Sequence, residues 1–598
     1  MKFRGVVIGC FVFLLGSFLW AETFNVNNPT EFQNALNTAA SNSENDTINV
    51  SADTYNITTT LTFTSTEDFS LFIDGAGTGS TILDGGNSTQ IFQFSATAAN
   101  ADLELQDMTF QNGNADHGGA IHLETVSASM SMSNCDFDDN TAGYVGGGAN
   151  IYSNTGEITI TYCTFRRNSS PNPSGYPYGT AGGLFVQTEG AGTDLRVAHC
   201  TFEDNTAQRD AAGAMLYPLG SGASMIVENN TFNNNSAVEF GGGCFIRMPA
   251  GNSTVTYENN TLTGNSTTGA GNGGGSYFEI ASGTLTLSDN IHTNNTSAWN
   301  AGGVWVELGS GVLEITDNTF TDNEAVENGG GVSIFLDEGT MLFHRNVLSS
   351  NTSDGVGGGF SAATTSGALT VSNNTFYSDS ASEAGGIYFY FDQSSAEADV
   401  FNNILWHDTS PAIAFSGAAS VTATYCDIEG GTGEPWFGAG CIDTDPLFID
   451  PENGNLYLSW ANWPIEDGTK SPCIDTGDPA SPQDPDNTRA DMGFHYFNQI
   501  TGINENRPNV TSTGLILQNF PNPFGSNTTI CYSVYKPYNV KIQIYNILGE
   551  LVETLVNDYK TTGNYEVIWN TEDLNSGLYI CRLIGDSNSA TKKLILTR

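Results

Sequence analysis

Residues 302–336 read GGVWVELGSGVLEITDNTFTDNEAVENGGGVSIFL, and the pattern of this stretch decides the fold. Leu313 and Ile315 alternate with polar residues, which predicts a half-buried strand. Phe320 breaks that parity, so we expect a bend near Asn318, because asparagine tolerates the left-handed backbone of a tight turn. After the glycines, alternate residues are again apolar, which predicts a further strand.

The same pattern recurs along most of the chain. Phe-x-x-Asn, or a close variant, starts at positions 110, 137, 165, 202, 232, 262, 292, 320, 348, 376 and 405. The equivalents of Asn318 in other repeats are Asn230, Asn260, Asn290, Asn346, Asn374 and Asn403. We expect these asparagines to stack as a hydrogen-bonded ladder. Repetition at so regular a period indicates a repeat architecture.

Three short strands in each 28–30-residue repeat, with no helix between them, predict an all-β right-handed parallel β-helix of about 11 regular coils. Irregular first coils are expected before residue 100. Asn28-Pro29-Thr30-Glu31 is typical of a helix start and predicts an N-terminal capping helix. Alternation at Val540, Ile542 and Ile544 predicts a small C-terminal β-sandwich.

The charge of the chain limits its partners. The 598 residues include 18 Lys plus Arg and 65 Asp plus Glu, for a formal net charge of −47. This balance excludes a nucleic-acid-binding protein, because phosphate contacts require a basic face. It also argues against polyanionic substrates.

The N-terminus is typical of a secretory signal peptide. Lys2 and Arg4 precede an apolar run from Val6 to Trp20, and Ala21 offers a small residue for cleavage. The run is too short to cross a bilayer, and no later segment approaches ~20 apolar residues. We therefore expect an exported protein with no transmembrane helix after signal cleavage.

Composition and repeat limits divide the chain into six predicted segments. These are a signal peptide (1–21), an N-terminal cap with the first coils (22–100), the regular repeats (101–430), a closing segment (431–497), a linker (498–512) and a C-terminal domain (513–598).

The repeat resembles two known groups. The pairing of Phe-x-x-Asn with Gly118-Gly119-Ala120-Ile121 is similar to the repeat of chlamydial polymorphic outer-membrane proteins, and more broadly to the pectin-lyase-like β-helix superfamily. Asp445-Pro446-Leu447-Phe448, Ser471-Pro472-Cys473-Ile474-Asp475 and Arg489-Ala490-Asp491-Met492-Gly493 resemble the choice-of-anchor Q segment that closes many bacterial surface β-helix proteins.

The C-terminal domain resembles a type A sorting domain of the type IX secretion system. The matching residues are Leu517-Gln518-Asn519-Phe520-Pro521-Asn522-Pro523-Phe524, Ile544-Tyr545-Asn546-Ile547-Leu548-Gly549 and Ser576-Gly577-Leu578-Tyr579. The resemblance implies that the type IX machinery handles residues 513–598. It also implies a secreted protein, or one on the outer-membrane surface of a Gram-negative bacterium.

Side chains two and four residues after the glycine clusters are expected to form rows on one outward sheet face. Exposed aromatic rings in a row can stack on sugar rings, which would make a glycan-binding face; the alternative is that they only stack on one another. The candidate ligand-binding residues are Phe245, Arg247, Tyr277, Trp305, Tyr388 and Tyr390, with Tyr176 and Tyr178 on an inserted loop.

Two carboxyls in these rows leave an enzyme open as the alternative. Glu279 and Glu307 should lie one coil apart, and retaining glycosidases hold two carboxyls at ~5–5.5 Å. These residues could act as acid and nucleophile, or they could be solvated surface acids. A polysaccharide lyase would also need a basic proton acceptor, and the arginines form no recognisable signature.

Aspartates are dense in the closing segment. Carboxylate oxygens at short spacing suit calcium, and turn-forming roles are the alternative. The calcium candidates are Asp443, Asp445, Asp450, Asp484, Asp486 and Asp491.

Cys441 and Cys473 are each followed by Ile-Asp-Thr and lie 32 residues apart, close to one coil. Stacked on adjacent coils, their Cα atoms would fall near the ~4.4–6.8 Å range of a disulfide. The alternative is a pair of unbonded inward thiols. Together, the sequence predicts an exported β-helix protein that binds or adheres to a glycan or surface polymer, with a carbohydrate-active enzyme as the alternative.

Overall fold

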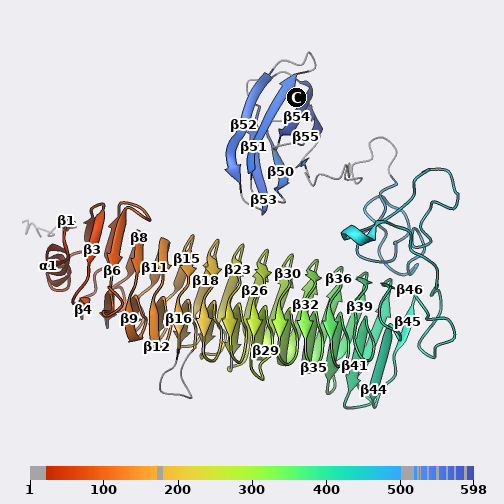
Figure 1. Cartoon of the computed structure of the whole chain (residues 1–598), viewed down its shortest axis with the longest axis horizontal. Helices are drawn as coiled ribbons and strands as arrows, with labels where there is room; N and C mark the ends of the chain where they lie inside the picture. The colour runs from red at the N-terminus through yellow and green to blue at the C-terminus, as the bar shows by residue number, and fades with distance from the viewer. Residues whose placement is uncertain are drawn as a thin grey trace, which may run out of the picture. The chain divides into compact units, whose positions relative to one another are not determined.

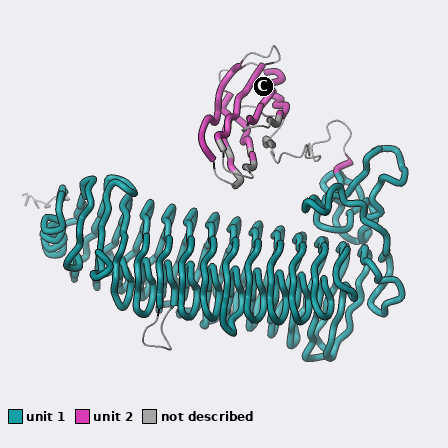
Figure 2. The backbone as a smooth tube through the Cα atoms, in the orientation of Figure 1, with its two compact units in different colours: residues 1–497 teal, residues 498–598 magenta. Residues whose placement is uncertain are grey.

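The computed structural model describes residues 22–171, 180–499 and 517–597, the last with gaps at 521–523, 525–526, 535–537, 547–550, 561–562, 572–573, 575 and 585–588. The chain divides into two compact units, residues 1–497 and 498–598 (Figure 2). No helix in the described part of the chain is long and apolar enough to cross a membrane.

The first unit is a parallel β-helix, as predicted (Figure 1). One coil consists of β32 (Val304–Thr316), β33 (Thr319–Thr321) and β34 (Glu324–Ala325). Each strand pairs in parallel with its equivalent one coil further on, so β32 pairs with β35 (Val332–His344) and β33 with β36 (Val347–Ser349). The strands form one 37-stranded sheet and one nine-stranded sheet of short strands.

Four rows of equivalent strands recur in the regular coils. The first row is β10 (Ile121–Thr125), β13 (Ala149–Ser153), β17 (Leu184–Thr188), β21 (Ala214–Pro218), β25 (Cys244–Met248), β29 (Ser276–Ser288), β32, β35, β38 (Phe360–Thr364), β41 (Ile387–Phe391) and β44 (Ile413–Gly417). The second is β15 (Thr164–Arg166), β19 (Thr201–Glu203), β23 (Thr231–Asn233), β27 (Thr261–Thr263), β30 (Ile291–Thr293), β33, β36, β40 (Thr375–Tyr377), β43 (Ile404–Trp406) and β46 (Asp427–Ile428). The nine-stranded sheet runs from β9 (Asn114–His117) to β37 (Thr352–Ser353).

The fourth row lies between the first and the second, with one strand in each coil. It is separate in β14 (Ile158–Thr161), β18 (Asp194–Ala198), β22 (Ser224–Glu228), β26 (Ser253–Glu258), β39 (Ala368–Ser372), β42 (Glu397–Phe401) and β45 (Thr422–Thr424). In β29, β32 and β35 it is continuous with the first strand. The corner there requires glycine: Gly311 has φ +132°, and a Cβ on it would lie 1.9 Å from the Gly283 carbonyl oxygen.

The Phe-x-x-Asn motif places both of its residues inside the β-helix. The rings of Phe110, Phe137, Phe165, Phe202 and Phe232 stack with centroids 4.7–5.0 Å apart. The motif asparagines are buried, and in each pair the Nδ2 atom donates to the Oδ1 atom of the next coil at 2.9–3.1 Å. The sequence pattern therefore marks a buried polar ladder beside an aromatic stack.

The predicted second ladder is also present. It runs from Asn230 to Asn403 with Nδ2-to-Oδ1 distances of 2.9–3.1 Å. The left-handed backbone, however, falls on the preceding residue: Asp317 has φ +58°, whereas Asn318 is a buried ladder member. The bend and the ladder are thus made by adjacent residues, not by one asparagine.

The N-terminal end of the β-helix is capped by α1 (Pro29–Ala39). The Asn28 side chain accepts a hydrogen bond from the Glu31 backbone N–H at 2.9 Å, as expected of an N-cap. Phe32, Ala35 and Leu36 are buried in the same core as the coils. The predicted capping helix is therefore confirmed. The irregular first coils contain β1 (Glu22–Val26), β2 (Asp46–Val50), β3 (Asp53–Asn56), β4 (Leu61–Ser65), β5 (Leu71–Gly75), β6 (Thr81–Asp84) and β7 (Phe92–Ala96). In the first regular coils, β8 (Leu103–Gln111) and β11 (Met130–Asp138) continue into the second row, where β11 pairs with β15.

After Ile442 the chain leaves the β-helix and packs against the outside of its last coils. This segment contains β47 (Phe448–Asp450), the 3₁₀ helix η1 (Pro451–Asn453) and β48 (Asn455–Leu458). Leu458, Trp460 and Met492 form a small core with Ile404. The backbone N–H of Phe494 donates to Thr375 Oγ1 at 3.0 Å, so the segment runs back across several coils.

The second unit is a two-sheet β-sandwich, in line with the prediction. One sheet contains β49 (Leu517–Phe520), β50 (Asn527–Val534) and β53 (Gly563–Asn570). The other contains β52 (Leu551–Lys560), β51 (Tyr538–Asn546), β54 (Gly577–Ile584) and β55 (Ser589–Leu596). Val540, Ile542, Ile544 and Trp569 are all buried between the sheets.

The motif ladder ends in two carboxyls, which makes the terminal coils sensitive to pH. Asp379 Oδ1 accepts from Asn351 Nδ2, and Asp408 Oδ1 accepts from the Asp379 backbone N–H. The Oδ2 atom of each aspartate is buried without a partner in the described residues. Burial raises the pKa of Asp379 to about 8 and that of Asp408 well above its usual range. The folded chain therefore holds protons that the unfolded chain releases.

This stabilisation is fully present below about pH 4 and is lost as the pH rises through about 8. Asp379→Asn should flatten part of that dependence and stabilise the protein at pH 9 by about 1–3 kcal/mol, because an amide can continue the ladder without ionising. Denaturant unfolding across this pH range measures the effect, with Asp53→Asn on the exposed β3 as the control. Equal pH profiles for wild type and Asp379→Asn would contradict the assignment.

Candidate functional site

Two rows of outward side chains follow the first row of strands, as predicted. Register pairs Tyr277 with Trp305 and Glu279 with Glu307, then continues coil by coil to Tyr388 and Tyr390. Neighbours in a row are therefore ~4.8 Å apart along the β-helix. The first outward row is Phe185, Met215, Phe245, Tyr277, Trp305, Ser333, Ser361 and Tyr388; the second is Gln187, Tyr217, Arg247, Glu279, Glu307, Phe335, Ala363 and Tyr390.

The N-terminal part of the first outward row is covered and cannot meet a ligand. Phe245 and Tyr277 are only 2% and 4% exposed. The ring of Phe240, from the loop before β25, stacks on Tyr277 with centroids 5.1 Å apart. The prediction of Phe245 and Tyr277 as ligand-binding residues is therefore wrong, because a loop side chain buries them.

Arg247 and Glu279 bind each other in the second outward row. Arg247 Nε donates to Glu279 Oε1 at 2.9 Å, and the guanidinium lies over the Tyr217 ring, 5.5 Å from its centroid. Glu307, in the next coil, is exposed and accepts a hydrogen bond from Tyr277 Oη at 3.3 Å. The predicted pair of carboxyls is thus adjacent in register, but one of them is already neutralised by an arginine.

A groove opens where the rows change to small residues. Ser333 and Ser361 follow Trp305 in the first outward row, and Ala363 lies beside them in the second. The resulting groove has a volume of about 540 Å³ and ends at Tyr388 and Tyr390. Three coil steps separate Trp305 from Tyr388, a distance of about 14 Å. The groove is therefore walled by aromatic rings at both ends and floored by small side chains.

The polar groups described next come from a strand residue, Glu307, and from two loop residues at equivalent positions, Asn300 and Asn328. Glu307 is the single charged side chain among the lining residues. Asn300 and Asn328 line the opposite edge, where Asn328 Nδ2 donates to Asn300 Oδ1 at 2.9 Å. Trp305 Nε1 is buried with no hydrogen-bond partner in the part of the chain that the structure describes.

Our sequence reasoning did not identify Asn300, Asn328 or Phe335 as site residues. The sequence does contain a signal for the two asparagines. Asn300 precedes Ala301-Gly302 and Asn328 precedes Gly329, at the position where Phe240 precedes Gly241 in an earlier coil. A large apolar residue at that position covers the outward face, whereas asparagine leaves it open. Phe335, 37% exposed, lies between Glu307 and Ala363 in the second outward row.

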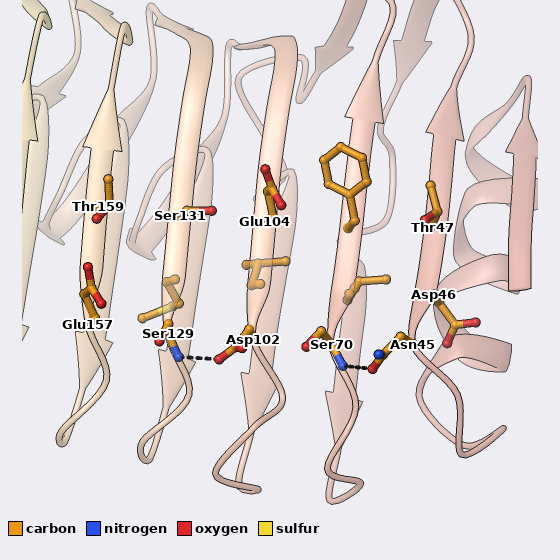
Figure 3. A pocket seen from close by; sticks show the side chains of 14 residues that line it. Asn45, Asp46, Thr47, Ser70, Asp102, Glu104, Ser129, Ser131, Glu157 and Thr159 are labelled. Carbon is orange, nitrogen blue, oxygen red and sulfur yellow. Dashed lines mark hydrogen bonds between the residues drawn. The ribbon is translucent and has the colours of Figure 1, made fainter. Parts of the chain in front are cut away.

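A second hollow, of about 460 Å³, lies over β2, β5, β8, β11 and β14 (Figure 3). Its lining contains the carboxyls of Asp46, Asp102, Glu104 and Glu157 and contains no lysine or arginine. Burial raises the pKa of Asp46 to about 6. The Ser129 backbone N–H donates to Asp102 Oδ1 at 2.7 Å, one of the bonds drawn in Figure 3. We did not anticipate this hollow, although residues 22–165 include no lysine or arginine at all.

The six aspartates predicted to bind calcium do not converge on one point. They accept hydrogen bonds from nearby groups: Asp443 from the Gly430 N–H, Asp486 from the Thr488 N–H, and Asp491 from the Phe497 N–H. Asp445, Asp450 and Asp484 likewise bind Leu447, Asn453 and Asp491. In the described residues, the one set of three ligand atoms within 4.8 Å of one another belongs to Glu22, Glu44 and Asp46.

The structure does not join Cys441 to Cys473, and their thiols have different partners. Their spacing suggested adjacent coils, but the chain leaves the β-helix after Ile442, so Cys473 lies in the closing segment. Cys473 Sγ donates to Asp427 Oδ2 at 3.0 Å, and Cys441 Sγ donates to the Ala423 carbonyl oxygen at 3.3 Å. Tyr176 and Tyr178, the remaining predicted ligand-binding residues, lie outside the described residues.

Comparison with known families gives two matches. The family model described as "Right handed beta helix region" matches residues 31–285, 219–376 and 251–428, which together cover more than half of the chain. The model described as "Secretion system C-terminal sorting domain" matches residues 518–597. A search of curated proteins found no match.

The covered and open parts of the first outward row should respond differently to truncation. Phe245→Ala should lower the free energy of unfolding by about 3 kcal/mol, because it removes a buried ring that packs on Tyr277 at 4.6 Å. Tyr390→Ala should change it by less than about 0.5 kcal/mol, since that side chain is 46% exposed. Denaturant unfolding of both variants checks this, and equal losses would contradict the division between covered and open parts.

Proposed function

Because this chain belongs to the right-handed β-helix family and ends in a secretion sorting domain, we propose that it works outside the cell as a glycan-binding or adhesion protein. Its sorting domain directs it to secretion or to attachment at the cell surface. The proposed binding site is the groove between Trp305 and Tyr388. The observation that carries the proposal is this groove, in which exposed aromatic rings flank hydroxyl, amide and carboxylate groups.

The side chains of the groove suit a sugar polymer. Tyr390 and Phe335 present partly exposed rings, on which the apolar faces of sugar rings can stack. Glu307 and Asn328 offer hydrogen-bond acceptors for hydroxyl groups. The unpartnered Trp305 Nε1 is a donor that a ligand oxygen could satisfy, since an unmade buried hydrogen bond is costly. The groove follows the β-helix axis over several coils, so it suits an extended chain of sugars.

The charges of the groove lining and of the whole protein favour an uncharged glycan as the ligand. The lining residues include no lysine or arginine, and Arg247, two coils before Glu307, is neutralised by Glu279. An acidic polysaccharide would bring its charges to Glu307 and to a protein of net charge −47. We therefore favour neutral sugar polymers over uronates and sulfated chains.

A carbohydrate-active enzyme remains the second candidate function, because Glu279 and Glu307 are register partners. Binding is favoured by the pairing of Glu279 with Arg247, which leaves Glu307 as the one carboxylate that lines the groove. Product analysis during any binding measurement separates the two: release of shorter sugar fragments would favour the enzyme.

The resemblance of residues 441–496 to the choice-of-anchor Q segment stays a prediction. The packing of this segment on Ile404 and Thr375 supports a role in closing the β-helix.

The groove aromatics should carry the binding. The full-length protein is tested against panels of neutral and of acidic polysaccharides, and binding is expected only to neutral ones. Combined Trp305→Ala and Tyr390→Ala should weaken binding roughly 5- to 150-fold, because each lost ring contact contributes about 0.5–1.5 kcal/mol.

Tyr162→Ala is the matched control, because this tyrosine is 58% exposed and does not line the groove. It should bind as wild type does. Unchanged affinity in the double variant would remove the groove from the proposal, and a preference for acidic polysaccharides would contradict the charge argument.

The sorting domain should be needed for passage across the outer membrane. In a host with the type IX pathway, a chain that lacks residues 513–598 should accumulate in the periplasm, because the machinery no longer has its signal. Cell fractionation and surface labelling measure this, and full-length Trp305→Ala serves as an exported control. Surface display of the truncated chain would contradict the assigned role of the domain.

A further inference from the structure

Cys426 and Cys441 lie one coil apart at the C-terminal end of the β-helix. Asp427 and Ile442 form a parallel bridge, and the Ile442 N–H donates to the Cys426 carbonyl oxygen at 2.8 Å. The two cysteines immediately precede these bridge partners, so they occupy equivalent positions on adjacent strands, ~4.8 Å apart. That separation lies within the Cα range of about 4.4–6.8 Å that disulfides adopt.

The second asparagine ladder ends at these thiols. The Asn403 N–H donates to Cys426 Sγ at 3.4 Å, and Cys426 is completely buried. Cys441 is partly exposed and packs against the same core. A hydrogen bond from Cys426 lowers the pKa of Cys441 to about 7, whereas burial raises the pKa of Cys426 well above its usual range. One thiol is thus accessible and reactive, and its neighbour is sheltered beside it.

We propose that Cys426 and Cys441 are joined by a disulfide in the exported protein, where it ties the last coil of the β-helix to the one before. Export makes the bond permissible, because disulfides form and persist outside the cytoplasm. Cys135, Cys163 and Cys200 also lie on adjacent coils, but all three are buried, whereas Cys441 is partly exposed and can meet an oxidant. Cys473 donates to Asp427 instead.

The oxidant is a protein or small-molecule disulfide of the extracytoplasmic space. The Cys441 thiolate attacks one sulfur of that disulfide and forms a mixed disulfide, and the other sulfur leaves as a thiol after taking up a proton. The Cys426 thiol then loses its proton and attacks Cys441 Sγ, which releases the second oxidant thiol. Two S–H bonds are replaced by one S–S bond, and two electrons and two protons pass to the oxidant.

The bond would close the turn that supports the closing segment. Residues 427–440 lie between the two cysteines and contain Gly430, Gly431, Gly433, Gly438 and Gly440. Glycine-rich turns lose much conformational entropy on folding, so this turn is a weak point at the end of a stacked fold. A covalent link across it limits opening of the last coil where no further coil covers it.

Peptide mapping tests the bond in full-length protein collected after export. Free thiols are alkylated in denaturant without reductant, and the chain is cut with trypsin and then with a glutamate-specific protease. The tryptic fragment 346–470 contains Cys426 and Cys441 and no other cysteine, whereas Cys473 falls in fragment 471–489. Cleavage after Glu429 should leave two pieces that stay joined until reductant is added.

Two results would overturn the proposal: alkylation of both Cys426 and Cys441, or a link from Cys441 to Cys473. A stability measurement on the same protein adds a second readout. Reductant should speed proteolysis within residues 427–440 of the wild type at least about tenfold. Cys441→Ser should be cut at that faster rate with or without reductant, and the control Cys244→Ser should behave as wild type does. Proteolysis of the wild type that is insensitive to reductant would also contradict the bond.

Discussion

The hydrogen bonds that join each coil to the next are the constraint on which the rest of the structure depends. Parallel strands fix the register between coils, so a residue and its equivalent one repeat later lie directly beside each other. The buried asparagine ladders reinforce this register, because each amide needs the amide of the next coil to satisfy it. A slip of one residue would leave a row of polar groups unpaired inside the core. Any feature of the surface therefore extends along the β-helix as a row.

The groove arises because side chains change along two sets of equivalent positions, one in the first outward row and one in the loops before β-strands of the first row. Serines at 333 and 361 replace the large side chains that stand earlier in the first outward row. In the loops, Asn300 and Asn328 replace Phe240, whose ring buries Tyr277. The same architecture is thus closed over one set of coils and open over another. A binding site on such a fold needs no change of backbone, only different side chains at equivalent positions.

Arginines in the described coils of the β-helix are paired with carboxylates. Arg166, Arg196, Arg247 and Arg345 each pair with a carboxylate one coil away. These pairs follow the register, since the partners sit at or near equivalent positions. They offset like-charge repulsion along the acidic β-helix. The two hollows described above have no basic side chain among their lining residues. The lining of both hollows is therefore acidic or uncharged.

The sequence by itself determined the coil, the ladder that contains Asn318, the capping helix and the sorting domain, because the same inward pattern recurs in every repeat. Only the contacts between coils showed that the motif asparagines form a ladder as well. The sequence also placed Trp305 and Tyr390 in outward rows. It did not show that Phe240 covers Phe245 and Tyr277, because that contact depends on how a loop folds. Nor did it show that Arg247 neutralises Glu279, because that ion pair depends on the rotamers of two long side chains. The neighbour of Cys441 was likewise decided by tertiary structure. The 32-residue spacing matched one coil, yet the chain left the β-helix after Ile442, and only the path of the backbone brought Cys441 beside Cys426 instead of Cys473.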